Sequence, residues 1–271
     1  MRKLNFPLVS LLIIIGVTTF VLIRTQIQWS RTVALVPPSV AVPSVSATPL
    51  PTTSISPQPT VVAASPTGLS TPKFTQTKTV AASAIYLSVP FTVQAPDADW
   101  SEPWKEGCEE AALLMVEAYL KGDRAATLPV GETKAKINAM VDWQHEKFGG
   151  HHDLGLADIV TIAKDYMGSK TARIKENATF DDIRNELRAG HPVILPLAGQ
   201  KLKNPYFKQP GPPYHVFVIT GFEGKDFISN ENGTKRGHDY KYSQTILENA
   251  WHDYVKGQPI ESGPRSYLVL E

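Results

Sequence analysis

The chain has three parts that differ in the composition and spacing of their hydrophobic and polar residues. Residues 6–23 carry no charge and are mostly Leu, Ile, Val and Phe. Residues 31–83 are dominated by Pro, Ser, Thr, Val and Ala, with nine prolines from Pro37 to Pro72. From residue 84 onward the apolar residues recur at the spacings of helices and strands. The pattern therefore predicts one folded domain, residues 84–271, which is long enough to bury a sizeable core.

Helices dominate the first half of this domain. Apolar positions recur at three- and four-residue steps between Cys108 and the stop signal at Gly122, which predicts an amphipathic helix. Similar patterns predict helices at 133–148, 156–167 and 179–189. The last of these begins with a capping box in which Asp182 takes the place of Glu. Residues 86–93, ahead of the helices, are typical of a short strand or an extended lead-in.

Strands dominate the second half. Short apolar and β-branched runs predict strands at 192–197, 215–222, 227–230 and 266–270, with a helix at 242–254. Residues 199–213 form a long loop with four prolines, and loops of this length inside a domain are often lids or substrate walls. The order predicts an α+β domain, with N-terminal helices packed on a C-terminal antiparallel sheet.

The first two parts predict a tethered protein. The apolar run follows Arg2 and Lys3 and just reaches the length that spans a bilayer, so residues 1–30 are expected to be an uncleaved, single-pass membrane anchor. The alternative is a cleaved signal peptide, although no small-residue cleavage site follows Ile23. Residues 31–83 are expected to be a disordered stalk. We therefore expect a cell-membrane protein with its domain outside the cytoplasm, or a secreted protein if the signal is removed.

Charge is distributed unevenly along the chain. Six of the 27 basic residues and none of the 26 acidic residues precede Asp97, so residues 97–271 carry a net charge of −5. This mildly acidic domain has no basic stripe. Nucleic acid is therefore not expected as a partner.

Cys108 is the only cysteine in the chain. It follows Gly107 and begins the first predicted helix, where the positive end of the helix dipole favours the nucleophilic thiolate. The alternative is that Cys108 is a small buried hydrophobic residue. In an exported protein, however, a single thiol is expected to be either reactive or paired with another chain.

His215 differs from the other six histidines because it begins a strongly β-prone run directly after the proline-rich loop. That position combines a fixed backbone with access to a cleft, as a catalytic base requires. The alternative is a histidine that fills the end of a sheet. His151 and His152 suggest metal ligands together with Asp153, but adjacent side chains point apart and no partner motif exists. Neither a metal nor a cofactor is therefore expected.

A nucleophile and a base require two further groups. A third residue that orients His215 is expected on the strand that returns after it, where Asn230 and Glu231 are the candidates. Neighbouring residues alternate faces, so an even-length hairpin turn favours Asn230 and an odd one favours Glu231. The Gln94 side-chain amide, with the Cys108 backbone N–H, is a candidate oxyanion donor.

In their order, five segments of the domain resemble the C39-like peptidases, a papain-like group whose namesakes cleave double-glycine leader peptides. The segments are 89–94 (VPFTVQ), 107–115 (GCEEAALLM), 190–194 (GHPVI), 215–221 (HVFVITG) and 230–234 (NENGT). The resemblance implies a papain-like fold and a thiol hydrolase that cleaves peptide or protein substrates. It makes Cys108 the nucleophile, His215 the base and Gln94 the oxyanion residue.

Two departures from the family pattern bear on the chemistry. An Asp-Pro pair usually follows the histidine strand, and Glu231-Asn232 stands in its place here. Glu109 and Glu110 stand where the family often has Gly-Pro, and their charges would raise the pKa of the thiol. Two other functions therefore remain: a peptidoglycan amidase or endopeptidase of the NlpC kind, and a catalytically silent peptide-binding module with the same fold.

Overall fold

A computed structural model describes residues 83–271 of the chain. The anchor and almost all of the stalk predicted above lie outside these residues. The α-helices are α2 (Cys108–Leu120), α3 (Val130–Phe148), α4 (Leu156–Thr161), α5 (Phe180–Arg188) and α6 (Gln244–Ala250). Within residues 83–271, no helix is both long and apolar enough to cross a bilayer.

One antiparallel sheet forms the centre of the domain. Its strands are β1 (Ala84–Tyr86), β2 (Ala172–Lys175), β3 (Val193–Leu197), β4 (His215–Glu223), β5 (Asp226–Asn230), β6 (Tyr240–Ser243) and β7 (Tyr267–Leu270). The strand order is β2-β7-β3-β4-β5-β6, and β1 pairs with the far end of β4. Every residue of β3 is buried, and so is every residue of β4 except Glu223. The continuous apolar runs in the sequence reflect this burial on both faces.

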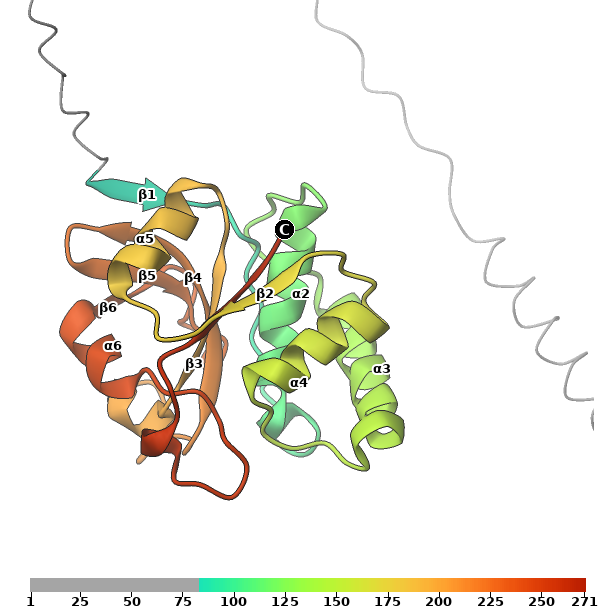
Figure 1. Ribbon diagram of the computed structural model, residues 1–271. Helices are drawn as coiled ribbons and strands as arrows, with labels where there is room; N and C mark the ends of the chain where they lie inside the picture. Colours follow the sequence, from blue (N-terminus) through green and yellow to red (C-terminus); the bar gives the residue numbers. More distant parts are fainter. Residues whose placement is uncertain (1–82) are drawn as a thin grey trace, which may run out of the picture. The chain divides into compact units, whose positions relative to one another are not determined.

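Helices cover both faces of the sheet (Figure 1). On one face, α2, α3 and α4 share a buried cluster with alternate strand residues such as Ile194 and Val218. On the other face, α5 and α6 pack against the intervening residues, such as Leu195 and Phe217. Alternation along each strand thus divides the core into two clusters. The α+β architecture predicted from the sequence is confirmed.

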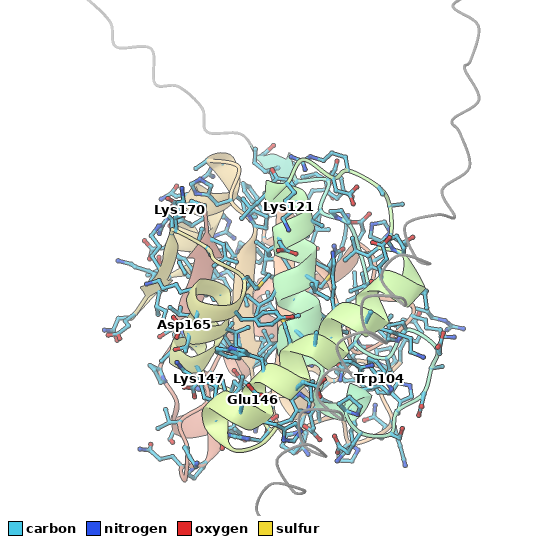
Figure 2. The ribbon with its side chains drawn as sticks, turned by 90° about the vertical axis from the view of Figure 1, so that its right-hand side faces the viewer. Trp104, Lys121, Glu146, Lys147, Asp165 and Lys170 are labelled. Atoms are coloured by element: carbon cyan, nitrogen blue, oxygen red, sulfur yellow. The ribbon has the colours of Figure 1, made fainter. Side chains whose placement is uncertain are left out.

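The helices on the first face form a layer of their own, in which α3 crosses over α2 (Figure 2). Lys147 near the end of α3 pairs with Asp165 at 2.9 Å, which ties α3 to the π-helical turn Ile162–Tyr166 after α4. At the start of this layer, the short turn Trp104–Glu106 leads directly into α2. Trp104 belongs to the buried cluster of α2, α3 and α4, which holds the beginning of α2 against this layer.

The predicted elements are mostly present, but three boundaries differ and two strands were missed. The helix predicted at 133–148 begins at Val130, and the strand or extended lead-in predicted at 86–93 is a strand only at Ala84–Tyr86. The helix predicted at 242–254 covers only Gln244–Ala250, because Tyr240–Ser243 pairs with β5 as an edge strand. The prediction also missed this strand and β2, because each has four residues and carries a lysine at an exposed position. Both strands alternate apolar and polar residues, but over four residues only, which is too short a run to identify a strand.

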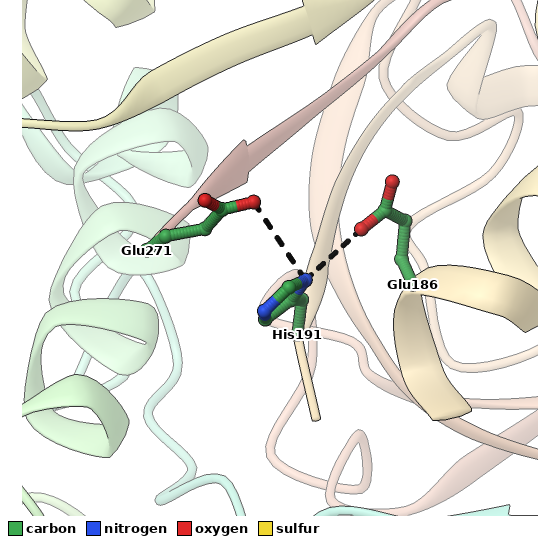
Figure 3. A group of neighbouring side chains, drawn as sticks. All are labelled: Glu186, His191 and Glu271. Carbon is green, nitrogen blue, oxygen red and sulfur yellow. Dashed lines mark hydrogen bonds and ion pairs between the residues drawn. The ribbon is translucent and has the colours of Figure 1, made fainter. Parts of the chain in front are cut away.

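A cluster of charged and polar side chains lies at the β2 edge of the sheet (Figure 3). Glu186, His191 and Glu271 bring ligand atoms within 4.8 Å of one another, an arrangement that would suit a metal ion. Arg173 already occupies the position between the carboxylates, however, with donors 2.7 Å from Glu186 and from Glu271. The cluster is therefore an ion-pair network that joins β2, α5 and the end of β7.

Replacing Glu186 by glutamine is expected to remove a pH-dependent part of the stability. Burial alone would raise the Glu186 pKa, but hydrogen bonds from Arg173, His191 and Tyr267 lower it to about 2 from its ordinary value of 4.5. A lowered pKa contributes stability above pH 4.5 that is lost as the pH falls toward 2. In thermal melts, Glu186→Gln should lower the melting temperature at pH 7 and less so at pH 3. The exposed Glu176→Gln is the matched control, and equal shifts at both pH values would contradict the prediction.

Candidate active site

Cys108 is the first residue of α2 and is only 4% exposed. Helix geometry leaves its backbone N–H without a partner inside the helix. Gly107 precedes it, and a Cβ at that position would lie 3.4 Å from the Trp104 carbonyl oxygen and 3.5 Å from that of Gln94. These are ordinary van der Waals separations, so the preceding turn and the Gln94 segment pack directly against this position.

Two buried glutamates follow the cysteine, each 1% exposed. Glu109 Oε2 lies 3.0 Å from Cys108 Sγ, and Glu109 Oε1 accepts a hydrogen bond from Leu154 N at 3.0 Å. Glu110 accepts a hydrogen bond from the Gln144 amide of α3. Burial raises the pKa of the Cys108 thiol well above its ordinary value, and an ionised Glu109 would raise it further. The sequence-based expectation about the two glutamates therefore holds in direction.

The dipeptide Glu231-Asn232 contacts both His215 and the cysteine segment. Glu231 Oε1 lies 2.5 Å from His215 Nε2, and both side chains are fully buried or nearly so. The next residue, Asn232, donates from Nδ2 to the Cys108 carbonyl oxygen at 2.8 Å. Consecutive residues thus connect the start of β4 to the start of α2.

The tautomer of His215 follows from its partner. A carboxylate only accepts hydrogen bonds, so the proton lies on Nε2 and the lone pair lies on Nδ1. Among the described residues, none makes a hydrogen bond to Nδ1. The ring stands edge-on to Phe207, with 5.5 Å between ring centroids. The imidazole therefore offers a base nitrogen while its other nitrogen is held in place.

A β-bulge decides which side chain reaches His215. The β4–β5 turn has two residues, Gly224 and Lys225, and by parity an even turn favours Asn230. The pairing shifts by one residue between Ile219 and Gly221, so the face assignments beyond the bulge are reversed. Glu231 consequently contacts His215. Asn230 instead donates to the Val89 carbonyl at 3.0 Å and does not contact the histidine.

Glu231 is itself held by three donors. Besides His215, it accepts from Gly233 N at 2.9 Å and from the Tyr242 hydroxyl at 2.8 Å. Asn204 in turn donates to the Tyr242 oxygen at 2.8 Å, which connects the long loop after β3 to the histidine. Three donors hold the Glu231 carboxyl group in one fixed orientation. Neither Tyr242 nor Asn204 could be identified from the sequence, because both contacts depend on tertiary packing.

Gln94 lies beside the cysteine segment and is 4% exposed. Its side-chain Nε2 donates to the carbonyl oxygens of Trp104 at 3.2 Å and Lys105 at 2.8 Å. Its backbone N–H donates to the Asn232 carbonyl at 2.9 Å. In this arrangement both amide protons face the turn before Cys108, so donation to an oxyanion requires the Gln94 amide to turn.

Asp153 is a further charged group near the site that the sequence did not suggest. Its charge raises the pKa of Cys108, and His215 in turn lowers the pKa of Asp153. Burial outweighs this effect and, with the Glu106 charge, raises the pKa of Asp153 to about 6. The residue lies in the loop between α3 and α4, directly before Leu154. Cys108 therefore has a third acidic residue nearby, in addition to Glu109 and Glu110.

Comparison with known families now identifies the chain. The model of the Peptidase C39-like family matches residues 86–259. The chain belongs to this family. The match spans Cys108, His215 and Glu231, and family membership agrees with the papain-like α+β fold expected from the sequence. It also makes the chain a relative of peptidases.

Other comparisons add little to this assignment. A solved structure of a Bacillus anthracis protein classed as a C39-like peptidase aligns with 69% of this chain and 97% of its own, at 16% identity and a TM-score of 0.46. No curated protein matches the chain.

Proposed function

We propose that the protein is a cysteine peptidase in which Cys108 is the nucleophile, His215 the general base and Glu231 the residue that orients His215. The observation that carries the proposal is the dipeptide Glu231-Asn232, since Glu231 binds the His215 ring and Asn232 binds the Cys108 carbonyl. A nucleophile and a base that act together need this kind of fixed relation. Family membership supports a peptide or protein substrate.

The reaction follows from the tautomer of His215. Its Nδ1 takes the proton of the Cys108 thiol, and the sulfur attacks the substrate carbonyl carbon. The imidazolium then gives that proton to the leaving amine, which leaves an acyl-enzyme that water hydrolyses. The Cys108 N–H at the start of α2 is one oxyanion donor, and Gln94 becomes the second when its amide turns toward the substrate.

A catalytically silent module is the second candidate, because one observation favours it. The thiol is buried beside Glu109, and its pKa is raised rather than lowered. A peptidase must overcome this effect through His215, whereas a binding module need not. Thiol reactivity therefore distinguishes the two functions.

The rate of thiol alkylation tests the proposal. Because Cys108 is the only cysteine, iodoacetamide labelling reports on it alone. In a peptidase the parent should label faster at pH 7 than a free thiol in solution, and His215→Ala should slow labelling by about 10-fold or more. The exposed-surface histidine His238→Ala is the matched control. Labelling no faster than a free thiol and unchanged by His215→Ala would instead favour the silent module.

The place of action is part of the same proposal. The apolar run at 6–23 and the proline-rich segment at 31–83 support a domain tethered to the membrane and working outside the cytoplasm. A peptidoglycan substrate of the NlpC kind is compatible with that location. Turnover of purified muropeptides, compared with turnover of linear peptides, separates the two substrate classes.

A further inference from the structure

The contacts of Glu109 define a buried position for one carboxyl group between the cysteine and a loop. Oε2 lies 3.0 Å from Cys108 Sγ, and Oε1 lies 3.0 Å from Leu154 N. The Leu154 carbonyl is fixed as well, because it accepts a hydrogen bond from the Tyr214 hydroxyl at 2.9 Å. Both the carboxyl group and the peptide that it binds are therefore held in place.

The Leu154 N–H determines which oxygen carries a proton. An N–H needs an acceptor, so Oε1 must present a lone pair. If Glu109 is protonated, its hydrogen is then on Oε2 and points to Cys108 Sγ. The carboxyl group becomes a donor to the sulfur in this state, whereas an ionised Glu109 would place a negative charge 3.0 Å from it.

Glu110 differs from Glu109 in its partners. Glu110 Oε1 lies 3.4 Å from His151 Nε2, and the Gln144 amide donates to the same oxygen. Glu109 has no Lys, Arg or His partner among the described residues. Two buried carboxyl groups that are neighbours do not readily ionise together. Of the two, only Glu110 has a cationic partner when His151 is protonated, so the proton belongs on Glu109.

The charges around Glu109 point in the same direction. Burial raises the pKa of Glu109 well above its ordinary value, and Glu110 adds to the effect. Asp153 from the loop raises it further, while the Leu154 hydrogen bond and the cysteine contact lower it. The positive end of the α2 dipole also favours the charged form, but it is weak next to full burial. Tyr214, the titratable group that faces Glu109 from the strand side, carries no charge at neutral pH.

We propose that Glu109 is a protonated carboxyl group whose Oε2–H donates a hydrogen bond to Cys108 Sγ and stabilises the thiolate. The inference rests on the proposed peptidase function. During the reaction the thiol proton moves to His215 Nδ1, and Glu109 keeps its own proton throughout. No charge is created on the carboxyl group. Glu109 thus compensates for the burial that disfavours the thiolate, as a neutral acid in an apolar site can do.

Two substitutions separate this donor from an ionised carboxylate. In Glu109→Gln, the Leu154 N–H again needs an acceptor, so the amide oxygen faces Leu154 and the NH₂ group faces the sulfur. This variant imitates the protonated acid with a weaker donor. Glu109→Met keeps the length of the side chain but supplies no donor. The corresponding Glu110→Gln variant is the matched control for a buried neighbouring carboxyl group.

Alkylation of Cys108 at pH 7 gives the expected order of rates. Glu109→Gln should label about 3-fold more slowly than the parent, and Glu109→Met about 30-fold more slowly, as expected for loss of a hydrogen bond to a charged group. If Glu109 is ionised, removal of its charge should instead accelerate labelling by about 10-fold or more in Glu109→Gln. Acceleration in that variant would overturn the proposal.

Infrared spectroscopy gives a second readout that requires neither activity nor Glu109→Met to fold. At pH 7 the parent should have a protonated-carboxyl C=O band that disappears in Glu109→Gln and persists in Glu110→Gln. A band that is absent from the parent, or unaffected in Glu109→Gln, would contradict the proposal. If the band behaves as expected but Cys108 labels slowly and independently of His215, then the peptidase function fails while the protonation of Glu109 stands.

Discussion

Replacement of Cys108 by serine is expected to abolish peptide hydrolysis, with a loss of at least about 10⁴-fold in kcat/KM. A hydroxyl group is far harder to deprotonate than a thiol, and this site already disfavours charge on the attacking atom through burial. The sequence offers no second cysteine that could substitute. The fold should be unaffected, because serine fits the space at the start of α2.

The assay must cover many peptide sequences, because the substrate of the protein is not identified. We would incubate the full chain with a mixture-based library of unblocked peptides and read the products by mass spectrometry. Parent protein alkylated at Cys108 serves as a chemical control and should be equally inactive. Thermal melts check that Cys108→Ser remains folded. Product formation by the serine variant at the parent's rate would mean that the thiol is not the nucleophile.

Substitution of Glu231 by glutamine is expected to have the second-largest effect, with kcat lower by about 10³-fold and KM little changed. An amide in place of the carboxylate loses the charge that stabilises the imidazolium, and its NH₂ group can impose the wrong tautomer on His215. The three donors that now converge on Glu231 also lose part of their acceptor. Cys108 alkylation should slow in parallel, because in the proposed mechanism His215 takes the proton of the thiol.

Two other variants calibrate this effect. Glu223→Gln makes the same chemical change at the exposed end of β4, where the carboxylate pairs only with Lys241, and should leave activity at the parent level. Tyr242→Phe removes one of the donors to Glu231 and should cost about 10-fold in kcat. A Glu231→Gln variant with the activity of Glu223→Gln would remove Glu231 from the mechanism.

The order of elements in the domain could be predicted because most helices and strands carry strong local patterns. Cys108 begins α2 as expected, and Thr179 and Asp182 form the predicted capping box at the start of α5. The edge strands β2 (ARIK) and β6 (YKYS) were missed because four residues are too few for an alternating pattern to be distinguished from chance. Local sequence therefore predicts elements well where burial is one-sided or complete, and poorly at the edges.

The contacts of the site depend on tertiary features that the sequence does not encode locally. The alternation of side chains along the returning strand left Asn230 and Glu231 as the two candidate partners of His215. The bulge between Ile219 and Gly221, which the sequence does not reveal, brings Glu231 to the histidine. The burial of Glu109 and Glu110 is equally non-local, since acidic residues in a first helical turn are usually exposed. Asp153 lies near the cysteine only because Leu154 binds Glu109.

The bulge in β4 also has an evolutionary consequence. Loss of one residue there, with the hairpin turn unchanged, would place an amide rather than an acid on the face of His215, and it would also reverse the faces of the core residues on one side of the bulge. A single codon deletion, remote from the histidine along the strand, would thus alter the chemistry of the site without touching any residue that performs it. Two chains with the same cysteine, histidine and glutamate would therefore differ in the partner of the histidine through strand alignment alone, and inspection of these three residues would not reveal the change.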